Sequence, residues 1–284
     1  MRILLTGCSG QVGSALVPAL APLGELQAFD RQGLDLLDPQ SIRNVTEKSG
    51  ADVIVNAAAY TAVDRAERER DAAFEVNGRA VGILARQAKS MDALLVHFST
   101  DYVFDGEKSS PYVETDPTSP LNAYGQSKLE GEQAIASSGC RYFIFRTSWV
   151  YSPRGRNFVH AMLAAAKAKP ELRVVADQRG APTSSDAIAG AVAHVLSQAG
   201  VPGIAGGLYH LSAGGATTWH GFASEILQAS GLKTPVVAIR SDEFPVAARR
   251  PKNSLLDNSK LGADFGVSMP DWRQGLAAVL AAIH

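Results

Sequence analysis

Residues 6–13 read T-G-C-S-G-Q-V-G, and this stretch decides the fold. It follows the short apolar run Arg2–Thr6, which is typical of a buried strand, and it precedes a helical pattern at residues 11–21. Glycines between a strand and a helix let the backbone turn sharply and approach a pyrophosphate, which rests on the helix N-terminus. An ordinary tight turn is the alternative, because the spacing G-x-x-G-x-x-G differs from the commonest dinucleotide fingerprint.

The glycine stretch opens a series of alternating strands and helices. The predicted strands are 2–6, 25–29, 52–56, 94–98 and 142–146. The predicted helices are 11–21, one that begins at Asp38-Pro39, one that reaches from the third strand to about residue 89, and 121–137. Because the strands are apolar on both faces, we expect an α/β protein of the Rossmann type, with a doubly wound parallel sheet between two layers of helices.

The pattern changes after about residue 150, where the alternation loosens and turn signals become dense. We therefore expect an NAD(P)-binding Rossmann domain at 1–150, whose last sheet elements extend to about residue 195. Residues 151–284 are then expected to form most of a smaller C-terminal lobe that is partly intertwined with the first domain.

Composition narrows the classes of function. The 284 residues carry 27 Lys and Arg against 28 Asp and Glu, so neither nucleic-acid binding nor a polybasic membrane face is expected. The two cysteines cannot build a disulfide framework, and neither they nor the six histidines show a metal-ligand spacing. No signal peptide and no apolar run as long as a membrane span is seen, so we expect a cytoplasmic protein without a metal site.

Two charged residues end the second predicted strand. Asp30 lies 20 residues after Gly10, where an acidic side chain hydrogen-bonds the adenosine ribose and favours NAD. Arg31 follows directly and could accept a 2′-phosphate instead. A plain turn residue is the alternative for Asp30. The two opposite charges predict that both NADH and NADPH are used.

Tyr124 and Lys128 form the pattern Y-x-x-x-K within the predicted helix 121–137. Residues four apart share one helix face. An ammonium beside a phenol lowers the phenol pKa, so the pair predicts a tyrosine that exchanges a proton near neutral pH. The lysine can also hold the nicotinamide ribose. A solvated helix face would show the same two residues.

A hydroxyl-rich segment, Ser99-Thr100-Asp101-Tyr102, follows the fourth strand. The carboxyl ends of parallel strands are where ligands bind in open α/β sheets. A hydroxyl at Ser99 or Thr100 can orient a substrate carbonyl. Together with Tyr124 and Lys128 it supports hydride transfer to a carbonyl group, with the tyrosine as the proton donor.

At this point the chain resembles the dTDP-4-dehydrorhamnose reductase family of the extended short-chain dehydrogenase/reductase superfamily. The resemblance spans nearly the whole chain. It rests on the glycine stretch and on N-A-A-A-Y-T-A-V-D-x-A-E (56–67), S-T-D-Y-V-F-D-G (99–106), S-P-L-N-x-Y-G-x-S-K-x-x-G-E (119–132), R-T-S-W-V-Y (146–151), G-A-P-T (180–183), G-L-Y-H-L (207–211) and R-P-K-N-S-L-L (250–256).

The resemblance implies a reaction and its residues. The family reduces the 4-keto group of dTDP-4-dehydro-L-rhamnose with NADPH or NADH, which gives dTDP-L-rhamnose, a precursor of cell-surface polysaccharide, in the last step of that pathway. Its motifs place the catalytic groups at Thr100, Tyr124 and Lys128. The smaller lobe would then bind the sugar nucleotide.

The resemblance also assigns the two ligands their residues. Besides Tyr124 and Lys128, its motifs would line the cofactor with Gly10, Gln11, Val12, Asp30, Asp35, Leu36, Ala59, Tyr60 and Thr61. The glycine spacing and the end of the second strand add Gly7, Gly13 and Arg31. The sugar nucleotide would be faced by Thr100, Asp101, Tyr102, Trp149 and Arg250. Tryptophan is often plain core, but a flat ring at a ligand mouth suits a sugar or a base. Arg250 would clamp the diphosphate, since guanidinium groups bind phosphate bidentately; a solvated loop is the alternative.

One family property is not matched by the sequence. Some members bind Mg²⁺ through acidic side chains, including one on the C-terminal helix, and dimerise there. In this chain the last acidic residue is Asp271, and the segment Arg273–His284 has none. The departure argues against the metal and against that dimer, and it leaves a monomer or another homodimer open.

Two other functions remain open. A 4,6-dehydratase or a 4-epimerase would keep NAD⁺ bound and return the hydride. A dehydratase typically has Asp-Glu after the threonine, whereas this chain has Asp101-Tyr102. The other possibility is a catalytically idle binding subunit, since the regulatory subunit of eukaryotic methionine adenosyltransferase is a homologue of the family. The intact trio argues against it.

Overall fold

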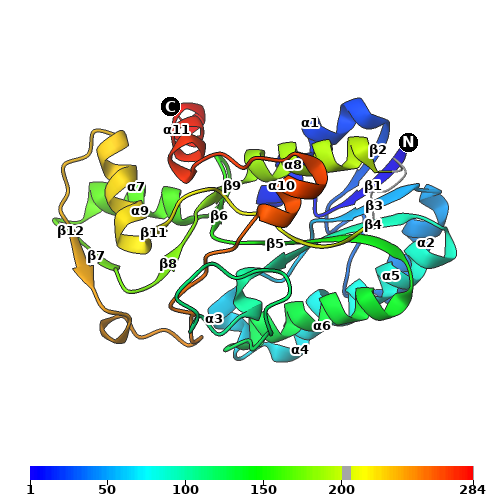
Figure 1. The fold of residues 1–284 in the computed structure, drawn as a ribbon, viewed down its shortest axis with the longest axis horizontal. Helices are drawn as coiled ribbons and strands as arrows, with labels where there is room; N and C mark the ends of the chain where they lie inside the picture. The colour runs from blue at the N-terminus through cyan, green and yellow to red at the C-terminus, as the bar shows by residue number, and fades with distance from the viewer. Residues whose placement is uncertain (200–205, 284) are drawn as a thin grey trace.

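A six-stranded parallel sheet lies at the centre of the protein (Figure 1). The computed structural model describes residues 1–199 and 206–283. The strand order is β10-β5-β4-β3-β1-β2, and every neighbouring pair is parallel. The strands are β1 (Arg2–Thr6), β2 (Glu25–Phe29), β3 (Val53–Asn56), β4 (Leu94–Thr100), β5 (Arg141–Thr147) and β10 (Gly207–His210). The predicted fold class is confirmed.

Helices cover both faces of this sheet (Figure 1). On one face, α1 (Gln11–Leu20), α8 (Ser185–Gln198) and α10 (Ser259–Phe265) share an apolar core with alternate strand residues such as Ile3 and Leu5. On the other face, α2 (Pro39–Ser49), α5 (Ala80–Ser90) and α6 (Ala123–Ser138) pack on Leu4, Ile54 and Leu95. Burial of both faces explains why the strands read as continuous apolar runs.

The segment between β3 and β4 differs from the prediction. A helix reaching to about residue 89 was expected, but the structure has α3 (Val63–Ala66), α4 (Arg70–Phe74), a π-helical turn η2 (Glu75–Arg79) and then α5. Asn77, buried in the π-helical turn, accepts a hydrogen bond from the Tyr60 backbone N–H and donates one to the Tyr60 carbonyl. The π-helical turn thus interrupts the expected helix and holds the segment after β3 in place through Asn77. Such turns often occur at functional sites.

A second layer of structure extends beyond the sheet. An apolar cluster around Phe222 and Trp272 joins α7 (Phe158–Ala168), α9 (Trp219–Ala229) and α11 (Trp272–Ile283). The short pairs β12–β7, β6–β9 and β11–β8 complete it, from Val236–Ile239, Leu172–Val175, Val150–Tyr151, Thr183–Ser184, Thr217–Thr218 and Arg179–Gly180. The chain returns to the sheet at β10 (207–210), later than residue 195, so the two parts interleave and the division near residue 150 stays a prediction.

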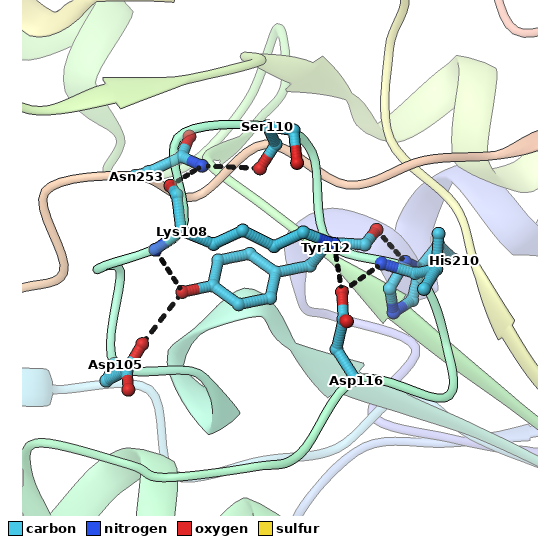
Figure 2. Close-up of polar contacts among 8 residues, drawn as sticks. Asp105, Lys108, Ser110, Tyr112, Asp116, His210 and Asn253 are labelled. Carbon is cyan, nitrogen blue, oxygen red and sulfur yellow. Dashed lines mark hydrogen bonds and ion pairs between the residues drawn. The ribbon is translucent and has the colours of Figure 1, made fainter.

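The segment that follows β4 is ordered by polar contacts (Figure 2). It begins with the 3₁₀ turn η3 (Asp101–Val103). Two further 3₁₀ turns, η1 (Ala21–Leu23) and η4 (Ser241–Glu243), lie elsewhere in the described part of the chain. The Tyr112 hydroxyl donates to Asp105, 2.8 Å away, and the Asn253 amide donates to the carbonyls of Lys108 and Ser110. Through Asn253, a C-terminal segment thus fixes the position of the loop expected at 99–120. The fixed loop keeps η3 at the end of β4.

Across the two ranges that the structure describes, no helix is both long and apolar enough to cross a bilayer.

Candidate active site

A cavity of about 1070 Å³ opens at the carboxyl ends of the parallel strands. It lies where the strand order reverses, since β2 follows β1 on one side and β3 lies on the other. Most residues singled out from the sequence line it: Gly7, Gly10, Gln11, Val12, Arg31, Asp35, Leu36, Ala59, Tyr60, Thr61, Thr100, Asp101, Tyr102, Tyr124, Lys128 and Trp149. Gly13, Asp30 and Arg250 lie outside this lining.

The glycine loop has no room for side chains. Gly7 has a φ of +71°, and a Cβ there would lie 2.6 Å from the Ala58 backbone nitrogen. A Cβ on Gly13 would lie 2.0 Å from the Gly7 oxygen. No side chain caps the N-terminus of α1, so its first N–H groups face the cavity. This cradle fits the pyrophosphate of a dinucleotide, because oriented N–H groups and the helix dipole favour an anion.

The two charged residues after β2 behave differently. Asp30 Oδ1 accepts hydrogen bonds from the backbone N–H groups of Gln32 and Gly33, 3.0 and 3.2 Å away, as a turn residue does. Arg31 lines the cavity, with 74% of its side chain exposed, and pairs with Asp35 at 3.7 Å. The exposed arginine can turn toward a 2′-phosphate by giving up this long ion pair, while the aspartate already serves the turn.

Thr100, Asp101 and Tyr124 come together at the end of β4. The Thr100 hydroxyl donates to Asp101 Oδ1 at 3.0 Å and accepts from the Tyr102 backbone N–H at 3.1 Å. Burial raises the pKa of the Asp101 carboxyl to about 7. Burial, and then the charge of Asp101, raise the pKa of Tyr124 to about 12, which a hydrogen bond with Thr100 partly opposes.

This value corrects one expectation from the sequence. Lys128 was expected to lower the pKa of Tyr124. Both residues lie on α6 as predicted, but the Lys128 amine points to His97 Nε2, 3.0 Å away. Burial lowers the pKa of Lys128 to about 7, although Glu132 opposes the shift. Lys128 is not among the causes that shift the pKa of Tyr124, and the raised pKa means that the tyrosine holds its proton at neutral pH.

Two tryptophans form one wall of the cavity. Trp149 and Trp219 are stacked, with ring centroids 3.6 Å apart and planes 7° from parallel. Trp149 has a φ of +48°, a conformation that costs energy for a non-glycine residue, and its ring packs on Gly180, where a Cβ would lie 2.4 Å from the indole. Strain at a ligand-sized cavity points to function. Trp219 was not predicted, because it lies 70 residues beyond Trp149 in a segment without a motif.

Arg250 is held away from the cavity lining. Its guanidinium pairs with Asp64 Oδ2 at 2.7 Å and interacts with the Tyr102 hydroxyl. The predicted diphosphate clamp is therefore tied to a carboxylate in this state. Arg154 and Arg156, which the sequence reading did not single out, do line the cavity and are exposed. Isolated arginines in a turn carry no sequence signal that would have separated them from surface residues.

Within residues 1–199 and 206–283, no three His, Cys, Asp or Glu side chains come together in a group that could hold a metal ion.

Comparisons with known proteins show the family of the chain. The family model described as RmlD substrate binding domain matches residues 1–284. A dTDP-4-dehydrorhamnose reductase of Burkholderia thailandensis is 49% identical, over 96% of each chain. The crystal structure of a dTDP-4-dehydrorhamnose reductase of Clostridium acetobutylicum is 36% identical, with a TM-score of 0.94 over 99% of each chain. The enzyme of that name from Bacillus anthracis, in complex with NADP, is 35% identical, with a TM-score of 0.93 over 99% of this chain and 98% of the other.

Proposed function

The chain belongs to the dTDP-4-dehydrorhamnose reductase family, and we propose that it reduces the 4-keto group of dTDP-4-dehydro-L-rhamnose to give dTDP-L-rhamnose, the last step of dTDP-rhamnose biosynthesis. The supporting observation is the convergence of Thr100, Tyr124 and Lys128 on a cavity that also contains a glycine loop. A protein that only bound nucleotides would not need these three groups at one sheet edge.

Thr100, Tyr124 and Lys128 have separate roles in the proposed reduction. NADPH or NADH, when bound, supplies the hydride. Tyr124 is protonated at neutral pH, because burial raises the pKa of its phenol, and it gives this proton to the oxygen of the reduced carbonyl. The Thr100 hydroxyl can turn from Asp101 to hold the same oxygen. Lys128, one helical turn from Tyr124, is placed to bind the nicotinamide ribose.

The cofactor is assigned to the glycine side of the cavity. Gly7, Gly10, Gln11 and Val12 would hold the pyrophosphate. Gly13 supports them through its close packing on Gly7. Arg31, Asp35 and Leu36 would surround the adenosine, with Asp30 shaping the turn below, and Ala59, Tyr60 and Thr61 would cover the nicotinamide side.

The sugar nucleotide is assigned to the opposite side. Asp101, Tyr102 and Trp149 line it, together with segments of the C-terminal lobe expected at 151–284. Arg250 can reach a diphosphate after releasing Asp64, and binding would then exchange one anionic partner for another. We place the enzyme in the cytoplasm, where its product serves cell-surface polysaccharide synthesis, and as a monomer or a homodimer.

The test is the stoichiometry of turnover. Purified protein is mixed with NADPH or NADH and the 4-keto sugar nucleotide, and the loss of absorbance is compared with the product formed. We expect one reduced cofactor oxidised per 4-hydroxyl product, with C6 unchanged. Product formed without cofactor oxidation would indicate an epimerase or a dehydratase instead. Binding without turnover would indicate the idle subunit.

A further inference from the structure

Behind the active site, four buried polar side chains form a hydrogen-bonded row. Lys128 Nζ lies 3.0 Å from His97 Nε2, His97 Nδ1 lies 3.1 Å from Asn56 Nδ2, and the Thr6 hydroxyl donates to Asn56 Oδ1 at 2.7 Å. Each of the four residues is 1% exposed. The row runs from Lys128 on α6 across β4 and β3 to Thr6 on β1. The reduction proposed above uses only Lys128. Buried polar groups that are fully paired fix one another's protonation states.

The orientation of the Asn56 amide is fixed by the backbone. The Ala58 N–H donates to Asn56 Oδ1 at 3.2 Å. A backbone N–H can only donate, so the atom facing it is the carbonyl oxygen of the side chain. The other amide atom, the NH₂ group, therefore faces His97. A flipped amide would place two donors against each other.

The amide in turn fixes the histidine tautomer. Since the Asn56 NH₂ group only donates, His97 Nδ1 must accept and carries no proton. A neutral ring then has its proton on Nε2, which faces Lys128 Nζ. For that contact to be a hydrogen bond, the lysine nitrogen must accept, and only a neutral amine has a lone pair to do so. The ammonium form would set donor against donor.

The surroundings of Lys128 agree with a neutral amine. On its own helix, Glu132 is the nearest carboxylate, but it is paired with Arg146 of β5 through contacts of 2.9 and 2.6 Å. Tyr124 lies one turn earlier on α6, and Asp101 lies at the end of β4 with a hydrogen bond from Thr100. Burial lowers the pKa of Lys128 to about 7 and that of His97 well below its usual range.

We propose that His97 is a positioning residue that holds Lys128 back as a neutral amine until the lysine takes up a proton, and that the resulting ammonium leaves His97 and moves into the cavity. The proposal deepens the reductase function and rests on it for the role of Lys128. The proton comes from solvent, and no other bond is made or broken. The moved ammonium shares a helix face with Tyr124, where its charge favours the phenolate that remains after Tyr124 gives its proton to the substrate.

The first measurement reads the tautomer directly. Protein labelled with ¹⁵N in histidine rings, and free of cofactor and substrate, is examined by NMR, and the His97 signals are assigned by their absence in His97→Phe. We expect a protonated Nε2 and an unprotonated Nδ1, unchanged between pH 6 and 9. A proton on Nδ1 would overturn the proposal, and this test does not depend on the folding of an Asn56 variant.

The second measurement follows Lys128 itself. Protein labelled with ¹³C at lysine Cε is titrated, and the Lys128 signal is identified by its loss in Lys128→Met. In Asn56→Asp a carboxylate oxygen replaces the NH₂ group, so it accepts from His97 Nδ1 and leaves Nε2 free to accept from the lysine. We expect the Lys128 midpoint to rise by about one pH unit or more, which is tenfold in the protonation equilibrium.

A double variant separates the tautomer from the added charge. In Asn56→Asp combined with His97→Phe, the new carboxylate remains but the ring can no longer relay its effect. We expect the double variant to titrate within about 0.3 unit of His97→Phe alone, in keeping with the additivity of uncoupled changes. If the double variant keeps the whole shift of Asn56→Asp, the charge acts through space and the proposal fails. These titrations need no substrate, so an idle protein with the expected midpoints would refute only the reductase function.

Discussion

The two sides of the cavity are built in different ways. The lining residues of the glycine-loop half fall within residues 7–14, 31–37 and 57–61, which follow the first three strands in direct succession. This half presents mainly backbone at its loop, where added Cβ atoms would clash. The tryptophan half draws on 98–102, 147–157 and Trp219, and it meets its ligand with side chains. Backbone groups such as those of the first half suit the pyrophosphate of any dinucleotide, whereas side chains such as those of the second half can distinguish one ligand from another.

The difference predicts how each half responds to mutation. Because Tyr124 stands where the halves meet, its loss should affect chemistry without affecting cofactor affinity. We expect Tyr124→Phe to lower kcat by ~10²–10⁴, the usual contribution of a positioned acid. The ring and its edge contact with Tyr102 stay in place. The measurement is steady-state turnover, together with NADPH binding followed by fluorescence.

A matched control lies at the far end of the sheet. Tyr142 is the second residue of β5 and lies at the amino end of the sheet, away from the cavity, so Tyr142→Phe should leave both quantities unchanged. If Tyr124→Phe retains near-wild-type kcat, the proton donor has been assigned wrongly. If it loses NADPH affinity as well, the separation between the two halves does not hold at this residue.

The same difference explains what could be predicted from the sequence. Strand, glycine loop and helix are contiguous, so apolar runs and glycine spacing were enough to place Gly7, Gly10 and the parallel sheet. The family motifs added Thr100 and Trp149. Trp219 could not be found, since the stack with Trp149 forms only when β11 brings a distant segment back.

Charge pairing was also beyond the sequence. Arg250 lies in a family motif, but its partner Asp64 is 186 residues away and no pattern links the two. The pKa of Tyr124 was predicted in the wrong direction for a related reason. The i, i+4 spacing predicts that the lysine and the tyrosine share one helix face. Burial sets the pKa of the lysine, and the direction of its side chain depends on His97 of β4, which the spacing does not reveal.

The tryptophan half contains a buried carboxyl group, and this should cost stability. Burial raises the pKa of Asp101 to about 7, whereas an unfolded aspartate titrates near ~3.9. Between these values the folded protein holds a proton that the unfolded chain has released, so stability falls as pH rises, by at most about 1.4 kcal/mol per pH unit. Above pH 7 the loss is complete.

Asp101→Asn removes this titration. We expect the wild type to lose stability relative to Asp101→Asn as the pH rises from 5 to 7. The measurement is the free energy of unfolding of both proteins by urea denaturation at each pH. A flat difference for Asp101→Asn would mean that its carboxyl is ionised in the folded protein.

The stacked tryptophans should matter for one ligand only. Trp219→Ala removes one ring of the pair and exposes the other, so we expect KM for the sugar nucleotide to rise roughly three- to tenfold, which corresponds to about 0.5–1.5 kcal/mol for an aromatic contact. NADPH affinity should stay within twofold. Trp219→Phe keeps a flat ring and should restore most of the loss. If NADPH affinity falls instead, Trp219 belongs to the glycine-loop half.

The smallest effect is expected within the glycine-loop half, at the one place where a side chain can discriminate. Arg31 is exposed at the cavity and Asp30 is committed to its turn, so the wild type should use NADPH and NADH within roughly tenfold of each other, or about 1.4 kcal/mol. Arg31→Ala should raise KM for NADPH by roughly three- to tenfold and leave NADH unchanged, because an exposed ion pair with a 2′-phosphate is worth about 1 kcal/mol and NADH has no such phosphate. The control is Arg141→Ala, since Arg141 pairs with Asp92 at the amino end of the sheet. Equal losses with both cofactors would show that Arg31 supports the loop rather than the 2′-phosphate, and they would leave the discrimination between NADPH and NADH to the backbone of residues 31–37.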